Sequence, residues 1–180
     1  MKVQNGGSPA ADAALWQERE SRQHLAEQGL RAWSQGDAEG GTQDGPNAVR
    51  VRLLHAVEAG PQDLLEADGY VFATPENLAA ISGQMKDFFD RCYYPVLDAL
   101  QGRPYASLVC AGSDGQNAAR QIARIATGWR LKPVAEPLIV CTHAQTPEAI
   151  LAPKQLGEDE LAACRALGES LAAGLYLGVF

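Results

Sequence analysis

Two short segments of the chain combine residue types that bind small molecules through backbone and side-chain polar groups. Glycine lets the backbone approach a ligand closely and tolerates positive φ angles, and free backbone amides are strong hydrogen-bond donors. We therefore predict a binding site formed by two runs of residues. The first run is Thr74, Pro75, Glu76, Asn77 and Leu78, and the second is Gly112, Ser113, Asp114 and Gly115.

Other reactive side chains do not form a recognisable catalytic set. Lys86, Asp90 and Arg91 stand at helical spacing, which suits salt bridges on a solvated helix face. His143 follows a predicted strand, but no serine or cysteine converges on it in the manner of a triad. Asp114 has a second interpretation, as the cap of the helix that follows it. We predict no catalytic side chain.

The four cysteines lie far apart and lack metal-ligand spacing. They are interpreted as reduced, mostly buried thiols, and no metal site is predicted.

Alternating strands and helices must position the two segments. Apolar runs predict strands at residues 49–53, 70–73, 105–111 and 134–141. Helical spacing of apolar residues predicts helices from Ser82 onward, after Gly115 and after Gly157. This order predicts an α/β fold with an open, doubly wound parallel sheet covered by helices on both faces. Ligands bind such sheets beyond the carboxyl ends of the strands, which adds residues 142–146 to the candidate loops.

The composition divides the chain near residue 48. Residues 1–47 are rich in glycine, glutamine, glutamate and alanine, with a weakly amphipathic stretch at residues 10–33, and we interpret them as an atypical arm and linker. Residues 48–180 carry the doubly wound pattern and are predicted to form the domain.

The overall charge excludes some classes of protein. The 180 residues include 15 Lys and Arg against 22 Asp and Glu, a formal net charge of −7. A nucleic-acid binder needs a basic face, and no apolar run reaches the roughly 18 residues of a membrane span. The N-terminus lacks the apolar core of a secretory signal, so a cytoplasmic location is expected.

One stretch of sequence is specific enough to indicate a family. It reads Ala67-Asp68-Gly69, then the apolar run Tyr70-Val71-Phe72-Ala73, then Thr74-Pro75-Glu76-Asn77, and continues with Ser82-Gly83-Gln84-Met85-Lys86-Asp87-Phe88-Phe89-Asp90-Arg91. This pattern resembles the flavodoxin-like superfamily, and within it the NAD(P)H-dependent FMN reductases and quinone reductases. The resemblance is strong over residues 67–91 and extends more weakly over 48–178.

The resemblance implies a function. Members of the family bind FMN and pass electrons from NAD(P)H, a transient co-substrate, through FMN to a quinone or similar acceptor. The flavin carries the chemistry, so no protein acid or base is required. The nine candidate residues would then bind the cofactor, with loop amides at the polar edge of the flavin ring. The family is often dimeric, so a homodimer is possible.

The chain also departs from the family pattern. The family begins with an apolar strand and a Ser/Thr/Gly-rich loop that binds the FMN phosphate at a helix N-terminus. Two weak counterparts are Met1-Lys2-Val3 before Asn5-Gly6-Gly7-Ser8-Pro9, and Leu15-Trp16 before Gln17-Glu18-Arg19-Glu20-Ser21-Arg22. The first strand is therefore expected to be absent or altered. Asn77-Leu78-Ala79 also lacks the aromatic residue that many relatives place beside the flavin ring.

These departures leave three interpretations open. The chain is an FMN-dependent oxidoreductase, or a flavodoxin-like binding module with a degenerate phosphate site and no catalysis, or its residue 1 is not the native start of the domain. Two other doubly wound classes are excluded. A response-regulator receiver needs an aspartate where Thr74 stands, and a dinucleotide-binding Rossmann fold needs Gly-x-Gly-x-x-Gly after its first strand.

Overall fold

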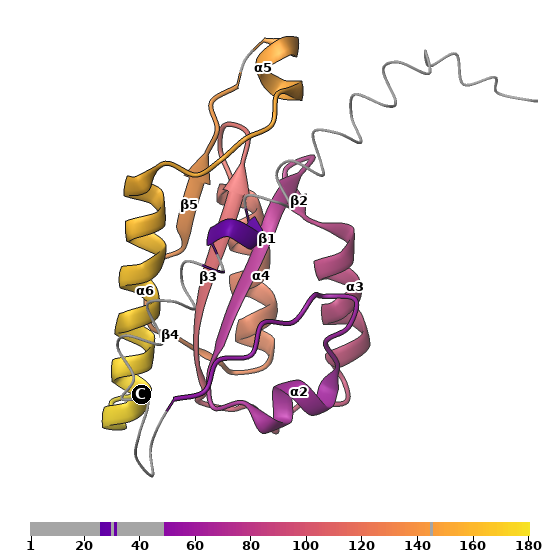
Figure 1. Ribbon diagram of the computed structural model, residues 1–180. Coiled ribbons are helices and arrows are strands. Elements are labelled where there is room, and N and C mark those ends of the chain that lie inside the picture. The colour runs from indigo at the N-terminus through magenta and orange to yellow at the C-terminus, as the bar shows by residue number, and fades with distance from the viewer. Residues whose placement is uncertain (1–25, 30, 32–48, 145) are drawn as a thin grey trace, which may run out of the picture.

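The structure, a computed structural model, describes residues 26–29, 31, 49–144 and 146–180. The helices and strands in the order of the chain are α2 (Pro61–Glu66), β1 (Tyr70–Asn77), β2 (Ala80–Ile81), α3 (Gly83–Cys92), β3 (Pro104–Ala111), α4 (Gln116–Gly128), β4 (Lys132–Pro133), β5 (Leu138–Cys141), α5 (Pro147–Leu151) and α6 (Glu158–Leu177) (Figure 1). Residues 26–29 are also helical. The helix predicted over residues 10–33 otherwise lies outside the described residues.

The sheet is built around β3, which is buried along its whole length. β1 pairs with β3 in parallel, from Tyr70 opposite Tyr105 to Pro75 opposite Cys110. β4 and β5 both pair with the other side of β3, also in parallel. Only the short β2 runs antiparallel, against the end of β1. The predicted open, mostly parallel sheet is confirmed.

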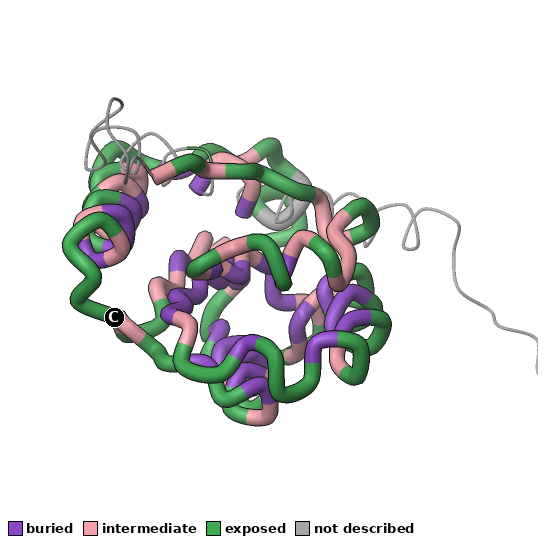
Figure 2. Tube along the Cα trace, turned by 90° about the horizontal axis from the view of Figure 1, so that it is seen from below, coloured by how far each residue is buried: buried purple, intermediate pink, exposed green. Residues whose placement is uncertain are grey.

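Helices cover both faces of this sheet, and each face has its own apolar core. On one face, Phe72 and Val109 pack with residues of α3 and α4. On the other, Leu108 and Cys110 pack with α6 and with Ala26. Viewed along the sheet from below, the buried residues of the flanking helices turn inward and the outer helix surfaces are exposed (Figure 2). Strand residues therefore alternate between two buried faces, as expected for a parallel sheet in an α/β protein.

Local signals fix the helix that follows β1. Ser82 is the N-cap of α3, and its hydroxyl accepts a hydrogen bond from the Met85 amide. The helix ends at Cys92, three residues before Pro95. Its solvated face carries the two predicted i,i+4 ion pairs, Lys86–Asp90 at 2.5 Å and Asp87–Arg91 at 2.7 Å.

The prediction of a first strand at residues 49–53 is wrong. These residues have no regular secondary structure, and Arg50, Arg52 and Leu53 are exposed. A strand needs a neighbour to satisfy its backbone polar groups, and in the described part of the chain no strand pairs with this segment. Apolar and charged residues do alternate in this segment, but alternation alone does not provide a neighbouring strand with which to pair.

Two further strand boundaries differ from the prediction. β1 does not stop at Thr74-Pro75 but continues to Asn77. A proline is tolerated there because, among the described residues, β3 is the only strand that pairs with residues 70–75, and a missing N–H on the other side of β1 leaves no described carbonyl unpaired.

The predicted strand 134–141 forms only over its last four residues, which are β5, and the short strand β4 lies just before the predicted range, at residues 132–133. β4 pairs Lys132 with Pro104, and β5 pairs Leu138 with Leu108. From the first pair to the second, the chain advances six positions while β3 advances four, so the segment between β4 and β5 cannot pair in register with β3. Pro137, in the break, has no N–H for the ladder. The loop predicted after β5 also contains the short helix α5.

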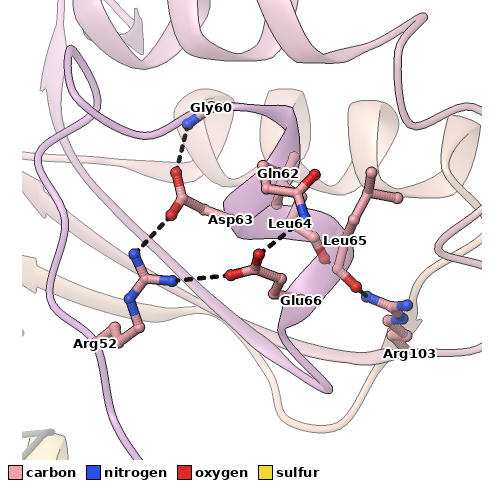
Figure 3. A network of polar contacts seen from close by, with 8 residues as sticks. All are labelled: Arg52, Gly60, Gln62, Asp63, Leu64, Leu65, Glu66 and Arg103. Atoms are coloured by element: carbon pink, nitrogen blue, oxygen red, sulfur yellow. Dashed lines mark hydrogen bonds and ion pairs between the residues drawn. The ribbon is translucent and has the colours of Figure 1, made fainter.

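Arg103 holds α2 against the start of β1. Its Nη1 atom donates to the carbonyl oxygens of Leu64 at 2.7 Å and Leu65 at 3.0 Å, and to that of Ala67 at 2.6 Å. It also contacts the Tyr70 hydroxyl at 3.0 Å. Figure 3 shows this arginine on one side of α2 and Arg52 on the other. The last carbonyls of α2, which lack partners within a helix, are thus satisfied by one guanidinium group.

Replacing Arg103 with alanine is expected to lower the free energy of unfolding by about 2 kcal/mol, because partly buried carbonyls lose a charged donor. Urea denaturation followed by circular dichroism measures the change. Arg130→Ala is the control, because that arginine forms an exposed ion pair with Asp98 and its loss is expected to cost under about 1 kcal/mol. Equal effects of the two changes would contradict the proposed role of Arg103.

Candidate functional site

The carboxyl ends of β1, β3 and β5 bring the three predicted loops together. Glu76 of the first loop accepts a hydrogen bond from the Gly115 amide of the second at 3.1 Å. The His143 amide of the third loop donates to the Gly112 carbonyl at 2.9 Å. The Cys141 thiol lies 3.8 Å from the Asp114 carbonyl oxygen. The predicted convergence of the loops at one sheet edge is confirmed.

The first loop is a tight hairpin, not an open loop. Glu76 pairs with Ile81 and Asn77 with Ala80, so only Leu78 and Ala79 form the turn. Both have positive φ angles, 52° and 57°, as in a type I′ turn. Asparagine and glycine normally occupy such positions, so this turn carries backbone strain at the edge of the site.

Replacing Leu78 with asparagine together with Ala79 with glycine is expected to raise the free energy of unfolding by about 1 kcal/mol. Asparagine and glycine tolerate the left-handed backbone conformation better than leucine and alanine, which favours the folded variant. The added conformational freedom of glycine in the unfolded chain opposes part of this gain. Thermal unfolding measures the change, expected as a rise of about 2–4 °C in Tm. A lower Tm would show that the turn is not strained.

Two side chains of α4 hold the hairpin in place. The Asn117 side-chain amide donates to the Ala79 carbonyl at 2.5 Å, and the Gln121 carbonyl oxygen accepts from the Ile81 amide at 3.0 Å. The sequence analysis did not single out either residue. The available signal was their spacing of four within a predicted helix, which places two amide side chains on one face.

Thr74 supports the hairpin from inside. Its side chain is fully buried. Its hydroxyl accepts from the Ser82 amide at 3.1 Å and lies 3.0 Å from the Pro75 carbonyl oxygen, to which it donates. Thr74 and Pro75 are both buried, so they are placed to shape the loop from beneath.

Two acceptor atoms in the hairpin are buried without a partner. They are Oε1 of Glu76, a residue only 7% exposed, and Oδ1 of Asn77. The other Glu76 carboxylate oxygen is held by Gly115. A buried polar atom without a hydrogen bond is costly, so both atoms are suited to accept a hydrogen bond from a bound molecule.

At Gly115 the backbone of the second loop packs closely against β3 and β5. This residue has φ of +78°, and a Cβ atom there would lie 2.5 Å from Ile139 Cγ2 and 3.1 Å from Ala111 Cβ. Gly115 is also the N-cap of α4, without a side-chain cap. The interpretation of Asp114 as that cap is therefore wrong. Asp114 and Ser113 are exposed at the rim, as is Leu78, while Gly112 is half-buried.

The thiols near the site are held in their neutral form. Burial raises the pKa of Cys141, and the nearby carboxylates of Glu76 and Asp114 raise it further. Burial also raises the pKa of Cys110 to about 12. Protonated thiols are poor nucleophiles, so covalent cysteine chemistry is disfavoured here. The described residues contain no group of three or more His, Cys, Asp or Glu placed to hold a metal ion.

The remaining histidines give no catalytic arrangement. His143 is exposed and has a positive φ of 50°. His55 is half-buried, with Nε2 3.1 Å from Glu27 Oε1. His24 lies outside the described residues. In the part of the chain that the structure covers, no helix is long and apolar enough to cross a membrane.

The sheet topology and the position of the loops define a flavodoxin-like α/β protein. Solved structures agree on the fold. A flavodoxin from the domain Archaea matches with a TM-score of 0.61 and 16% identity, over 84% of this chain and 90% of its own. A WrbA-like flavodoxin from Agrobacterium tumefaciens matches with a TM-score of 0.56 and 18% identity, over 81% and 88%.

A third structure, rubredoxin oxygen:oxidoreductase from Desulfovibrio gigas, matches with a TM-score of 0.66 and 11% identity. That match covers 87% of this chain but 34% of the larger protein. At these identities the three structures establish the fold alone.

Sequence comparison identifies the family. Residues 46–146 match the NADPH-dependent FMN reductase family. The chain is also 32% identical over 132 residues to a flavodoxin from Aquifex aeolicus, a match that covers 69% of each. The chain belongs to the NADPH-dependent FMN reductase family of flavodoxin-like oxidoreductases, whose cofactor is FMN. The family resemblance read from residues 67–91 is confirmed.

The described part of the site fits the ring end of FMN. The flavin ring carries an N–H donor on its polar edge, and the unpartnered Glu76 and Asn77 oxygens are acceptors. Gly115 is buried, and Ile139 and Ala111 fill the space where a Cβ atom would lie, so this glycine shapes the loop beside those acceptors. The two weak counterparts of a phosphate loop, both before residue 23, lie outside the described residues.

Proposed function

We propose that this protein transfers electrons from NAD(P)H through FMN to a quinone or a similar small acceptor. FMN supplies the redox chemistry when bound. The protein's own part is to bind and orient the ring at the carboxyl edge of the sheet and to keep it between rigid loops. The family match supports the class of reaction, and the quinone acceptor is the proposal.

The observation that carries the proposal is the pair of buried, unpartnered acceptors at Glu76 and Asn77. They lie on a hairpin fixed by α4, next to the Gly115 turn, where a ligand of an open α/β sheet is expected. We assign Glu76 and Asn77 to direct contact with the ring. Thr74, Pro75 and Gly115 act as positioning residues of the FMN site, and Leu78, Gly112, Ser113 and Asp114 form the rim.

The first experiment is titration of the full chain with FMN, followed by flavin absorbance and fluorescence. Saturable quenching of flavin fluorescence is the expected result. Consumption of NADH or NADPH in the presence of a quinone then tests turnover. Binding without turnover would favour the alternative, a flavodoxin-like binding module. No binding at all would overturn the proposal. Light scattering of the same sample tests whether the protein is a homodimer.

A Glu76→Ala variant locates the site. We expect its FMN affinity to fall about tenfold, equivalent to about 1.4 kcal/mol, because it loses both the acceptor and the tie to Gly115. Glu76→Gln keeps a side-chain oxygen for Gly115 and is expected to retain more affinity. Glu66→Ala is the matched control, since Glu66 lies on α2 at the opposite end of the sheet (Figure 1). Equal affinity in Glu76→Ala and the unchanged protein would place FMN elsewhere.

A further inference from the structure

Helix α4 carries a positive surface on a protein of negative net charge. Its 13 residues include Arg120 and Arg124 and no acidic residue, whereas the whole chain has a formal net charge of −7. Each of the helices α2, α3, α5 and α6 contains at least one acidic residue. Both arginines of α4 are exposed, and we call them the arginine pair.

The arginine pair has no counter-charge within the described residues. Five other described arginines donate to carboxylates or carbonyl oxygens of the protein, namely Arg52, Arg91, Arg103, Arg130 and Arg165. No described carboxylate forms an ion pair with Arg120 or Arg124. Like charges four positions apart on a helix repel each other and destabilise it. The arrangement therefore favours an anion that approaches α4 from solvent.

The arginine pair lies next to the proposed FMN site. α4 begins directly after Gly115, its N-cap. Arg120 stands three positions after Asn117, whose side chain holds the tip of the hairpin, and residues at this spacing are neighbours on a helix surface. At 1.5 Å of rise per residue, Arg120 and Arg124 lie about 6 and 12 Å along the helix from its first residue. Because the Cα–Cβ bonds of a helix tilt toward its N-terminus, both side chains start out in the direction of the site.

Phosphate is the anion that the arginine pair suits best, since a guanidinium group binds phosphate oxygens through paired, charge-assisted N–H donors. NADPH and NADH differ by one phosphate, on the adenosine ribose. When the nicotinamide ring lies against the flavin ring, the adenosine end of an extended dinucleotide reaches away from the ring site. We propose that Arg120 and Arg124 bind this 2′-phosphate and thereby make NADPH the preferred co-substrate. This inference rests on the proposed electron transfer from NAD(P)H at the same site.

Nucleotide fragments test the arginine pair without turnover. The probes are adenosine 2′,5′-bisphosphate, which carries the extra phosphate, and adenosine 5′-monophosphate, which lacks it. Calorimetric titration of the full chain with FMN present gives both affinities, at a low and fixed ionic strength because salt screens exposed charges. We expect the bisphosphate to bind about tenfold more tightly, as for one charged hydrogen-bonded contact. The variant that combines Arg120→Gln with Arg124→Gln is expected to lose this preference.

Arg130→Gln is the matched control, because Arg130 lies just beyond the end of α4 and pairs with Asp98. It is expected to leave both affinities unchanged. Circular dichroism checks that α4 remains folded in the double variant, which no longer contains the like-charge repulsion.

The outcomes separate this inference from the proposed function. Failure of the bisphosphate to bind, equal affinity for the two probes, or an unchanged preference in the double variant overturns the inference. An equal loss of affinity for both probes also overturns it, because the arginine pair would then hold a group that the probes share. If FMN itself does not bind, the proposed function fails in its own titration. FMN binding without a preference for the bisphosphate overturns the inference alone.

Discussion

Replacing Trp129 with alanine is expected to lower the free energy of unfolding by about 4 kcal/mol, the largest effect of any single change considered. Trp129 is 1% exposed. Its ring lies 5.5 Å from that of Phe89, 5.9 Å from that of Tyr93 and 6.4 Å from that of Phe72. The change therefore opens a cavity between α3, α4 and the sheet, and Trp→Ala changes of this kind cost about 3–5 kcal/mol.

Part of the loss is polar, and a second variant separates it. The Trp129 indole N–H donates to the Tyr93 carbonyl at 3.1 Å. Trp129→Phe keeps most of the ring but not this donor, so its cost is expected to be about 1–2 kcal/mol. Urea denaturation gives both values. Tyr94→Ala is the control because Tyr94 is 79% exposed. A Trp129→Ala loss below about 1 kcal/mol would contradict the packing of this core.

Replacing Gly115 with alanine is expected to lower the free energy of unfolding by about 3 kcal/mol and to weaken FMN binding. Two causes act together. A residue with a Cβ at φ of +78° costs about 1–2 kcal/mol. Overpacking against Ile139 and Ala111, at 2.5 Å and 3.1 Å, adds about 1–3 kcal/mol. The neighbours sit on β5 and β3, so the loop must move, and the hydrogen bond to Glu76 moves with it.

Gly102 provides the matched control for Gly115. Its φ is +82°, nearly the same, but a Cβ there meets nothing within 4 Å. Gly102→Ala therefore isolates the backbone cost, about 1–2 kcal/mol, with FMN affinity unchanged. Urea denaturation and FMN titration of both variants give the comparison. If Gly115→Ala were no more damaging than Gly102→Ala, the close packing of this turn would be refuted.

The local sequence was sufficient to predict a structural feature wherever the residues that indicate it and the interactions that cause it lie within a few positions of each other. Ser82 predicted the start of α3 because an N-cap needs only the next turn. The apolar run 105–111 predicted the central strand because burial on both faces removes alternation. The motif at residues 67–91 also indicated the family, and the placement of loops at one sheet edge followed from the α/β order.

Sequence reasoning failed where a residue's state depends on a distant partner. Arg50 and Arg52 alternate with apolar residues like a strand, yet residues 49–53 have no neighbouring strand in the described sheet. Pro75 looks like a strand terminus, but β1 continues to Asn77 in the described sheet. Residues 134–137 look like part of the last strand, yet only Leu138–Cys141 pair in register with β3.

The sequence by itself determined the fold class, the family and the loops that meet at the carboxyl edge of the sheet, since these follow from local patterns and chain order. Only the tertiary structure showed that Glu76 and Asn77 carry unpartnered buried oxygens and that Asn117 and Gln121 hold the hairpin. Hydrogen-bond satisfaction and packing are set by residues tens of positions apart, and that information exists only in three dimensions.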